Sequence, residues 1–222
     1  MVVSKYEKNQ LKDCILFQKI PMEWTEEFIE TIGGYKKTYG KGQMVFQEGE
    51  IVETIGIILQ GECGIIKLYP DGKEHFLQKL YKKYLVGIEI VCTSSKISPY
   101  SILCLEETTV YFFPYKKLEL SGFLKEEIRL ELQKNILQWI ASENIKKYYK
   151  INILSTNSLR ERILLYLYLQ KRKAGKDTFT IPFDRAQFAN YLCVNRSALS
   201  KELGKMQREG VIICKKNTFT IL

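Results

Sequence analysis

Residues 180–213 read TIPFDRAQFANYLCVNRSALSKELGKMQREGVII, and this stretch decides the fold of the C-terminal part of the chain. Asp184 can cap one helix, and Asn195 can cap a second helix that runs to about Arg208. The segment Cys193–Asn195 between them is short enough to form a turn. Two short helices joined by such a turn form the helix-turn-helix layout.

The second of these helices separates into a buried and an exposed face. Leu199, Leu203 and Met206 recur at i, i+4 and i+7, which is the spacing of a buried edge. At 100° per residue, an arc of roughly 140° on the other side gathers four hydrogen-bonding side chains. They are Arg196, Ser197, Ser200 and Lys201. This arrangement predicts a helix that packs on one side and presents donors on the other.

Those donors suit the exposed edges of duplex DNA. An arginine can bind guanine O6 and N7 with two hydrogen bonds, so we expect Arg196 to read a base. Ser197 and Lys201 can reach a base edge or a phosphate from the same face. Two apolar runs flank Lys215-Lys216-Asn217, which predicts a hairpin with a basic tip. Such a hairpin is typical of a wing that lies along the DNA backbone. An amphipathic helix pair with ordinary surface charge is the alternative.

The positive charge of the chain is concentrated at its C-terminal end. The chain holds 34 Lys+Arg and 25 Asp+Glu, for a formal net charge of +9. Residues 155–222 hold 13 basic and 5 acidic side chains, whereas residues 1–154 hold 21 and 20. This distribution favours a binding module for a polyanion, attached to a nearly neutral domain. A solvated basic surface is the alternative interpretation.

Composition excludes several other classes of protein. A hydrophobic fraction of 45% with 12% aromatic residues is enough for a packed core, and 14 Gly with 5 Pro exclude a collagen-like chain. No run approaches the ~18 apolar residues that span a bilayer, and the N-terminus lacks the apolar core of a signal peptide. We therefore expect a cytoplasmic protein with no membrane partner.

The titratable residues indicate neither a metal site nor an enzyme. Six cysteines are dispersed without a C-x-x-C pair, which favours free, mostly buried thiols in a reducing compartment. The chain has one His, no carboxylate pair with a partner base, and no Gly-rich phosphate loop. No cofactor is therefore expected, although a small-molecule effector is compatible with the sequence.

The N-terminal half of the chain changes from helix to strand. Residues 22–32 predict a short helix with Thr25 as its N-cap, and strand-like runs then alternate with turn residues. The runs are MVFQ, TIGIILQG, CGIIKLY, HFLQKL, SILCL and TVYFF. Pro70-Asp71-Gly72 predicts a hairpin turn between two of them. Strands at this spacing indicate an antiparallel sandwich or small barrel.

A long helix is predicted over residues 124–151, since no Pro or Gly interrupts this segment. It would be up to ~28 residues, or ~40 Å, long. It carries two apolar stripes, Ile128/Leu132/Ile136/Ile140 and Leu130/Leu137/Asn144/Ile151. One stripe can cover the β-domain and the other can meet an identical helix across a dimer axis. A helix packed wholly within its own chain is the alternative.

Three stretches of the chain carry a family resemblance. They are the N-terminal Leu11-x-x-Cys14-x-Leu16-Phe17, the segment Lys41–Glu50 with Gly61 and Asp71-Gly72, and the helix-turn-helix Asn190–Leu203. In combination they resemble the CRP/FNR family of bacterial transcription regulators, nearly from end to end.

The resemblance implies a homodimer that binds double-stranded DNA, and it allows RNA polymerase as a further partner. It implies that Arg196, Ser197 and Lys201 read bases. The expected phosphate contacts are Arg185, Asn195, Ser200, Lys215 and Lys216. The dimer helix is expected to use Ile128, Leu132, Ile136, Leu137 and Ile140.

The departures from the family pattern concern the effector. Members that bind cyclic nucleotides use a Gly-Glu pair and an Arg-Ser or Arg-Thr pair, which here fall on Gly87-Ile88 and Ser98-Pro99. Glu89 comes one place late, and no guanidinium is left for the phosphate, so we expect an effector other than cyclic AMP. The expected effector pocket is Gly87, Ile88, Glu89, Ser98, Pro99 and Tyr100. Cys14 alone at the N-terminal end also argues against an iron–sulfur sensor, and Cys193 stands where the family motif usually has glycine.

These features predict an α+β protein with three parts. Residues 1–120 would form an antiparallel, jelly-roll-like β-roll that acts as a sensor, and residues 121–153 the long dimerisation helix. Residues 154–222 would form a winged helix-turn-helix. The predicted function is a dimeric, sequence-specific DNA-binding transcription regulator that reads an inverted repeat. An effector-independent regulator, whose β-roll serves only dimerisation or protein contacts, is the alternative.

Overall fold

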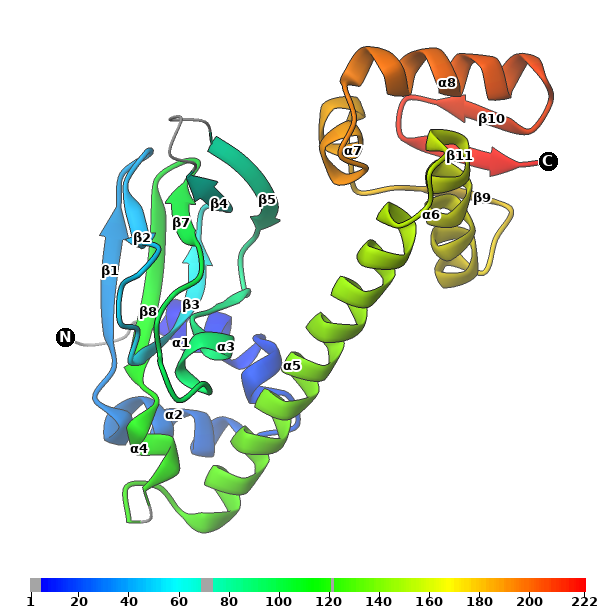
Figure 1. Cartoon of the computed structure of the whole chain (residues 1–222). Helices are drawn as coiled ribbons and strands as arrows, with labels where there is room; N and C mark the ends of the chain where they lie inside the picture. Colours follow the sequence, from blue (N-terminus) through cyan, green and yellow to red (C-terminus); the bar gives the residue numbers. More distant parts are fainter. Residues whose placement is uncertain (1–4, 69–73, 121) are drawn as a thin grey trace. The chain divides into compact units, whose positions relative to one another are not determined.

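A computed structural model describes residues 5–68, 74–120 and 122–222, and its element order confirms the predicted α+β fold class. The chain divides into two compact units, Met1–Glu143 and Asn144–Leu222, and the division falls inside the longest helix (Figure 1). Each unit has its own hydrophobic core.

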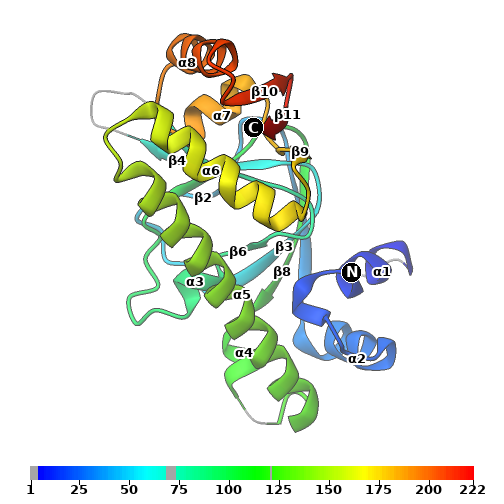
Figure 2. The same ribbon diagram turned by 90° about the vertical axis from the view of Figure 1, so that its right-hand side faces the viewer.

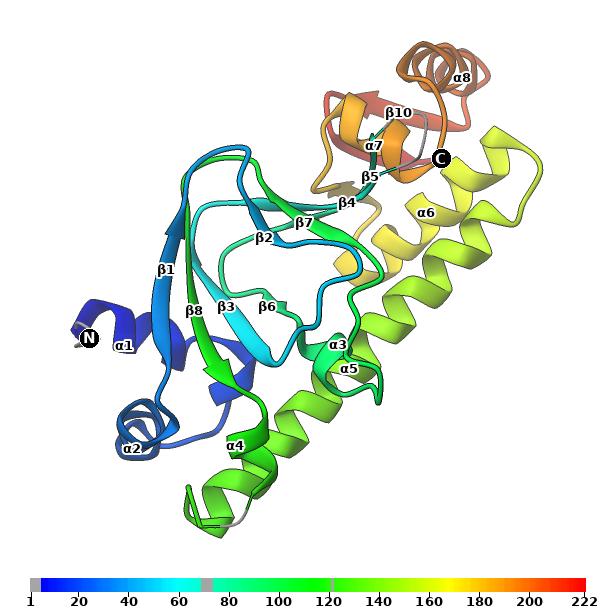
Figure 3. The ribbon, with the colours of Figure 1, turned by 60° about the vertical axis from the view of Figure 1, so that its left-hand side comes forward.

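The N-terminal unit is built around two four-stranded antiparallel sheets. One has the order β1-β8-β3-β6 and the other β2-β7-β4-β5. The strands are β1 Tyr35–Tyr39, β2 Met44–Phe46, β3 Thr54–Gln60, β4 Cys63–Leu68, β5 Glu74–Leu80, β6 Leu85–Val86, β7 Ser101–Cys104 and β8 Thr108–Pro114. Figure 3 shows these strands around a common interior, as expected for a β-roll. The predicted turn at Pro70-Asp71-Gly72 lies outside the described residues.

One glycine shows why the strands connect as they do. Gly61 joins β3 to β4 with φ +89°, and a Cβ at this position would lie 2.4 Å from the carbonyl oxygen of Glu107. A side chain here would clash with backbone, so only glycine permits this turn.

The N-terminal unit also contains short helices, and the N-cap of one of them differs from the prediction. They are α1 Lys5–Lys12, the 3-10 turn η1 Ile15–Phe17, α2 Met22–Ile32, α3 Ile88–Val91 and α4 Lys116–Glu119. Thr25 was predicted as the N-cap of α2, and this is wrong because Pro21 occupies that position. Proline suits a helix start with its fixed φ, and Thr25 is buried within the helix with its hydroxyl donating to the Pro21 carbonyl.

The long helix α5 spans Glu126–Leu154, so it begins two residues later and ends three residues later than predicted. Its first half packs on the β-roll through Ile128, Leu132 and Ile136, which are buried. Asn135 is also buried, and its side-chain amide donates to the carbonyls of Leu16 and Gln18. These contacts fix the start of α5 to the N-terminal unit.

The C-terminal unit contains three further helices and a small sheet. The helices are α6 Leu159–Ala174, α7 Arg185–Tyr191 and α8 Arg196–Arg208, and the strands are β9 Thr178–Thr180, β10 Ile212–Lys215 and β11 Thr218–Ile221. The sheet has the order β10-β11-β9 and lies beside the three helices (Figure 2). This is the predicted winged helix-turn-helix.

Candidate nucleic-acid interface

The first helix of the motif, α7, begins at a capping box. The Asp184 carboxylate accepts from the backbone N–H of Gln187 over 2.8 Å, and the Gln187 side chain accepts from the N–H of Asp184 over 2.9 Å. Two of the backbone donors at the helix start are thereby satisfied. The predicted cap at Asp184 is confirmed.

The turn between α7 and α8 has an unusual backbone. Cys193 has φ +54°, in the left-handed region where glycine is favoured, and its side chain is exposed. The N–H of Val194 donates to the Ala189 carbonyl over 3.0 Å, which holds the turn against the buried end of α7. Asn195 occupies the N-cap position of α8, but its side chain makes no capping hydrogen bond. Its exposed amide is therefore not used by the helix start.

The recognition helix α8 has the two faces that the sequence predicts. Leu199, Leu203 and Met206 are buried in the core of the C-terminal unit. The residues expected to contact DNA from this helix are all exposed; they are Arg196, Ser197, Ser200 and Lys201. An exposed row of donors at the start of a helix has the geometry needed to enter a major groove.

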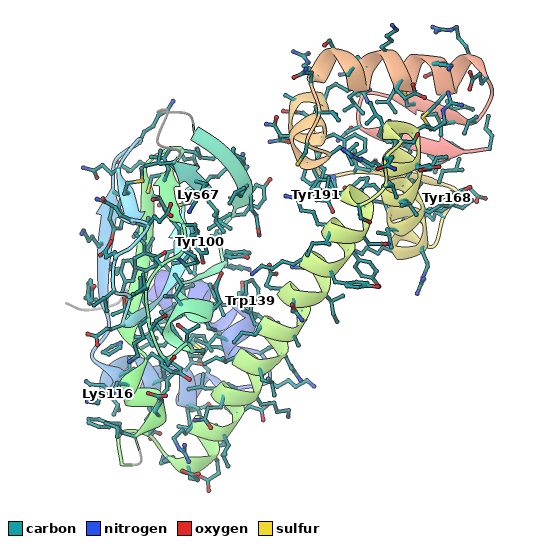
Figure 4. All side chains as sticks on the ribbon, in the orientation of Figure 1. Lys67, Tyr100, Lys116, Trp139, Tyr168 and Tyr191 are labelled. Carbon is teal, nitrogen blue, oxygen red and sulfur yellow. The ribbon has the colours of Figure 1, made fainter. Side chains whose placement is uncertain are left out.

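An aromatic cluster packs α7 against α6 and β11. Tyr166 of α6 lies with its ring centroid 4.9 Å from that of Phe188 and 5.1 Å from that of Tyr191. Phe188 in turn meets Phe219 of β11 edge to face, at 6.2 Å. Figure 4 labels Tyr191 on α7. Close-packed rings at these distances hold α7 on α6 and on the sheet.

The wing is a hairpin of β10 and β11, and its tip is basic. Lys215 pairs with Thr218, so Lys216-Asn217 forms a two-residue turn, with φ +56° at Lys216. Arg185 of α7 reaches this tip, where its Nη2 donates to the Lys216 carbonyl over 3.1 Å and its guanidinium lies over Phe219. The structure thus brings together three of the predicted phosphate contacts, although Arg185 already uses one donor within the protein.

Two arginines at the start of α6 were not singled out from the sequence. Arg160 forms ion pairs with Glu202, which lies in α8, and with Glu209, which is the C-cap of α8. Arg162 donates from Nε to the Thr156 carbonyl and from Nη1 to the carbonyl of Leu192, next to the turn. Their partners lie 30 or more residues away in all but one case, so no local pattern marks them.

Polar groups of the predicted effector pocket are hydrogen-bonded to one another. The Tyr100 hydroxyl donates to the Glu89 carboxylate over 2.6 Å, and the buried Ser98 hydroxyl donates to the Tyr100 carbonyl over 2.6 Å. Gly87 and Ile88 are buried at the start of α3, whereas Pro99 is exposed. Burial, and then the charge of Glu89, raise the pKa of the Tyr100 phenol. Figure 4 shows Tyr100 within the β-roll.

A second phenol–carboxylate pair joins the β-roll to α5. The Tyr84 hydroxyl donates to Glu143 over 2.8 Å and accepts from Gln78 over 3.0 Å, and the Trp139 ring meets the Tyr84 ring edge to face at 4.8 Å. Glu143 is only 8% exposed. Sequence reasoning missed this pair, because 59 residues separate its members.

The five residues expected on the dimer helix have different environments. Ile128, Leu132 and Ile136 are buried in the core of their own N-terminal unit, and Ile140 is partly buried against it. Leu137 is 68% exposed. The first four therefore pack within the chain, whereas Leu137 is mostly exposed.

No candidate metal site is found in the described part of the chain. Residues 5–68, 74–120 and 122–222 contain no group of three His, Cys, Asp or Glu side chains that could hold a metal ion. The Cys14 thiol is buried and donates to the Lys83 carbonyl, and burial raises its pKa to about 11. The buried Cys14 thiol and its surroundings do not fit an iron–sulfur cluster.

Within the same described ranges, no helix has the length and apolar character needed to cross a membrane.

Comparison with protein families gives two matches. The cyclic nucleotide-binding domain matches residues 36–120, and the Crp-like helix-turn-helix domain matches residues 161–222. The first covers the β-roll, and the second covers α7, α8 and the wing.

Two regulators resemble the chain over nearly its whole length. The fumarate nitrate reduction regulatory protein of Klebsiella oxytoca is 24% identical over 220 residues, 95% of this chain and 85% of that protein. The fumarate and nitrate reduction regulatory protein of Vibrio cholerae is 24% identical over 221 residues, 95% of this chain and 86% of the relative.

Solved structures share the fold. CprK in complex with OCPA aligns with a TM-score of 0.66 and 22% identity, over 88% of this chain and 89% of CprK. The c-di-GMP responsive global regulator CLP of Xanthomonas campestris aligns with a TM-score of 0.64 and 15% identity, over 90% of this chain and 99% of that one.

Proposed function

The chain belongs to the CRP/FNR family of DNA-binding transcription regulators, and from this premise we propose that it acts as a homodimer that reads an inverted-repeat operator. We assign residues 1–120 to a sensor domain, 121–153 to the dimerisation helix and 154–222 to the DNA-binding domain. RNA polymerase is the further partner that we propose for such a regulator.

The observation that carries the base-reading proposal is the exposed donor row of α8, supported from behind by buried Leu199 and Leu203. We propose that Arg196, Ser197 and Lys201 contact base edges. Arg196 stands first in the helix and has the length and paired donors that match guanine.

The backbone of the DNA would be held by residues around that row. We propose Arg185, Asn195, Ser200, Lys215 and Lys216 as phosphate contacts. The wing tip and the exposed Asn195 amide support this proposal. Arg185 would act in part through the wing, since its guanidinium already binds the Lys216 carbonyl.

The dimer would form along the exposed side of α5. Leu130, Leu137 and Ile151 lie on one seven-residue repeat, whose remaining position is Asn144, and they are 53%, 68% and 67% exposed. A long helix that exposes such an apolar stripe is typical of a coiled-coil partner surface.

The regulator would respond to an effector other than cyclic AMP. The segment that matches the cyclic nucleotide-binding domain, residues 36–120, contains no arginine. A buried cyclic phosphate would lack the bidentate partner that compensates its charge. We propose the region of Gly87, Ile88, Glu89, Ser98, Pro99 and Tyr100 as the effector pocket.

A second candidate function is an effector-independent regulator. It is favoured by the hydrogen bonds from Tyr100 to Glu89 and from Ser98 to the Tyr100 carbonyl, because these polar groups already have partners inside the protein. A thermal-shift panel of metabolites separates the two candidates. A specific rise in melting temperature, abolished by Tyr100→Phe, favours an effector, whereas no shift together with DNA binding in the absence of any addition favours the second candidate.

Substitution of Arg196 tests the proposed base reading. Arg196→Ala is expected to cost about 1–3 kcal/mol of binding free energy on the preferred sequence and to relax the preference at one base pair. Binding is measured by fluorescence anisotropy on the preferred duplex and on its single base-pair variants. Arg172→Ala, which removes an exposed arginine near the end of α6, is the matched control. An equal loss on all sequences would mean that Arg196 holds phosphate only.

A further inference from the structure

Arg160 of α6 contacts α8, on the side of α8 that lies away from its row of exposed donors. Its Nε donates to the carboxylate of Glu202 over 2.7 Å, and its Nη1 donates to Glu209 over 2.5 Å. Glu202 and Glu209 are seven residues apart, or about two helical turns. The Arg160 guanidinium therefore contacts α8 at two points, about two turns apart along the helix axis.

The position of these carboxylates makes the contact sensitive to rotation of α8. At 100° per residue, counted from Arg196, Glu202 lies at about 240° and Glu209 at about 220°. The donor row occupies an arc from 0° to roughly 140°, so the ion pairs leave it free. With a helix radius of about 5–6 Å, a rotation of 10° would move a side chain at the surface by about 1 Å. Such a shift is large compared with hydrogen-bond tolerances.

The network is partly shielded from solvent. The side chains of Arg160, Glu202 and Glu209 are 31%, 22% and 40% exposed, whereas those of the pair Lys171–Asp177 are 34% and 79% exposed. Hydrogen bonds to the Glu209 and Glu202 carboxylates raise the pKa of Arg160, and the hydrogen bond from Arg160 lowers the pKa of Glu209. The Arg160 Nη2 is buried and has no hydrogen-bond partner among the described residues.

We propose that Arg160 is a positioning residue for base recognition, which sets the rotation and axial position of α8 through Glu202 and Glu209. Arg160 touches no base in this scheme and acts through the helix that carries Arg196, Ser197 and Lys201. The inference rests on the proposed function of α8.

The alternative is that Arg160 only neutralises two carboxylates near DNA, and a set of variants in the full chain separates the two roles. Arg160→Gln breaks both contacts. The triple variant Arg160→Gln/Glu202→Gln/Glu209→Gln breaks them too, but removes two negative charges along with the positive one. Arg160→Lys keeps the charge without the planar fork of donors. Binding is measured on the preferred sequence and on single base-pair variants at the positions that α8 reads.

The positioning role predicts a change in discrimination. Arg160→Gln is expected to lower the ratio of affinities between preferred and variant sequences at least about fivefold, and the triple variant is expected not to restore it. Arg160→Lys is expected to recover part of the ratio. The proposal is overturned if the triple variant regains the wild-type ratio, or if Arg160→Gln weakens binding equally on every sequence.

Two controls keep this result independent of folding and of the proposed function. Far-UV circular dichroism and melting follow the fold of each variant, and Glu209→Gln alone, which keeps the Glu202 contact, is a milder change that is expected to lower the ratio less. If Arg196→Ala loses discrimination and Arg160→Gln does not, the positioning role is wrong and the proposed function stands. If the wild-type chain shows no sequence preference, both are wrong.

Discussion

Cys193 has a left-handed backbone conformation although it is not glycine. Its φ of +54° lies in the left-handed region, which costs a non-glycine residue roughly 1–2 kcal/mol. The turn needs this conformation because the next N–H must reach back to the Ala189 carbonyl. The sequence already singled out this position, since family motifs usually have glycine there.

Cys193→Gly should therefore stabilise the C-terminal unit. The gain is expected to be at most about 1 kcal/mol, because glycine also loses more backbone entropy on folding. Urea unfolding followed by circular dichroism measures it, with Cys193→Ala as the control that keeps the Cβ and the strain. Equal stability of the Gly and Ala variants would contradict the assignment of strain to this turn.

Tyr84 gives the chain a predicted dependence on high pH. Burial, and then the charge of Glu143, raise the pKa of the Tyr84 phenol above the value of about 10 found in unfolded chains. A raised pKa means that the stabilisation is fully present below pH ~10 and is lost as the pH rises further. The free energy of unfolding should thus fall above pH ~10.

Tyr84→Phe should remove part of that fall. At neutral pH the same variant should lose about 1–3 kcal/mol, because the Glu143 carboxylate loses a hydrogen-bond partner in a buried place. Urea unfolding between pH 7 and pH 11 tests both effects, with exposed Tyr148→Phe as the control. A wild-type pH profile in the Tyr84 variant would contradict the assignment.

Individual residues were predictable where the signal is local. The exposure of Arg196 and Lys201 and the cap at Asp184 follow from spacing on a helix and from capping chemistry. Arg160 and Tyr84 could not be found in this way, since their partners come from other elements and carry no periodic pattern.

Among the elements, α5 has one apolar stripe that is buried and another that is exposed. Ile128 and Leu132 pack on the β-roll of the same chain, whereas Leu130 and Leu137 are exposed. The four-residue and seven-residue repeats of the sequence predicted this separation. The sequence could not say which of the apolar residues of α5 a partner would meet, because both repeats consist mainly of apolar residues.

A charge at Leu137 should separate the proposed dimer. Leu137→Glu places like charges at a position that α5 would present to its copy, so the monomer fraction should rise and DNA affinity should fall at least about tenfold. Analytical ultracentrifugation measures the assembly, and Leu120→Glu, at a comparably apolar exposed residue outside α5, is the control. A dimer of unchanged stability in the Leu137 variant would place the interface elsewhere.

Thr25 shows where tertiary context overrides a local rule. It has the chemistry of an N-cap, yet α2 spans the predicted residues 22–32 and its N-cap is Pro21. Thr25 lies in the core instead, and its hydroxyl donates to the carbonyl four residues back. Phe28 and Ile32 on the same face of α2 are also buried.

At the scale of the whole molecule, the basic excess and the helix-turn-helix lie in the same part of the chain. Residues 155–222 carry the basic excess together with α7, α8 and the wing, whereas residues 1–154 are nearly neutral and contain the β-roll. The fold class was predictable because each part of the chain has its own strong pattern of helix or strand. The hydrogen bonds from Tyr100 to Glu89 and from Tyr84 to Glu143 in the N-terminal unit could not be predicted, because they join side chains that are distant in the sequence.

The central claim is that two copies of the chain read an inverted repeat through α8. Selection of bound duplexes from a randomised pool by the full-length protein tests it most directly. We predict enrichment of an inverted repeat whose half-site centres lie about 10–10.5 base pairs, or roughly 34 Å, apart. Enrichment of a single half-site, or of no sequence at all, would contradict the claim.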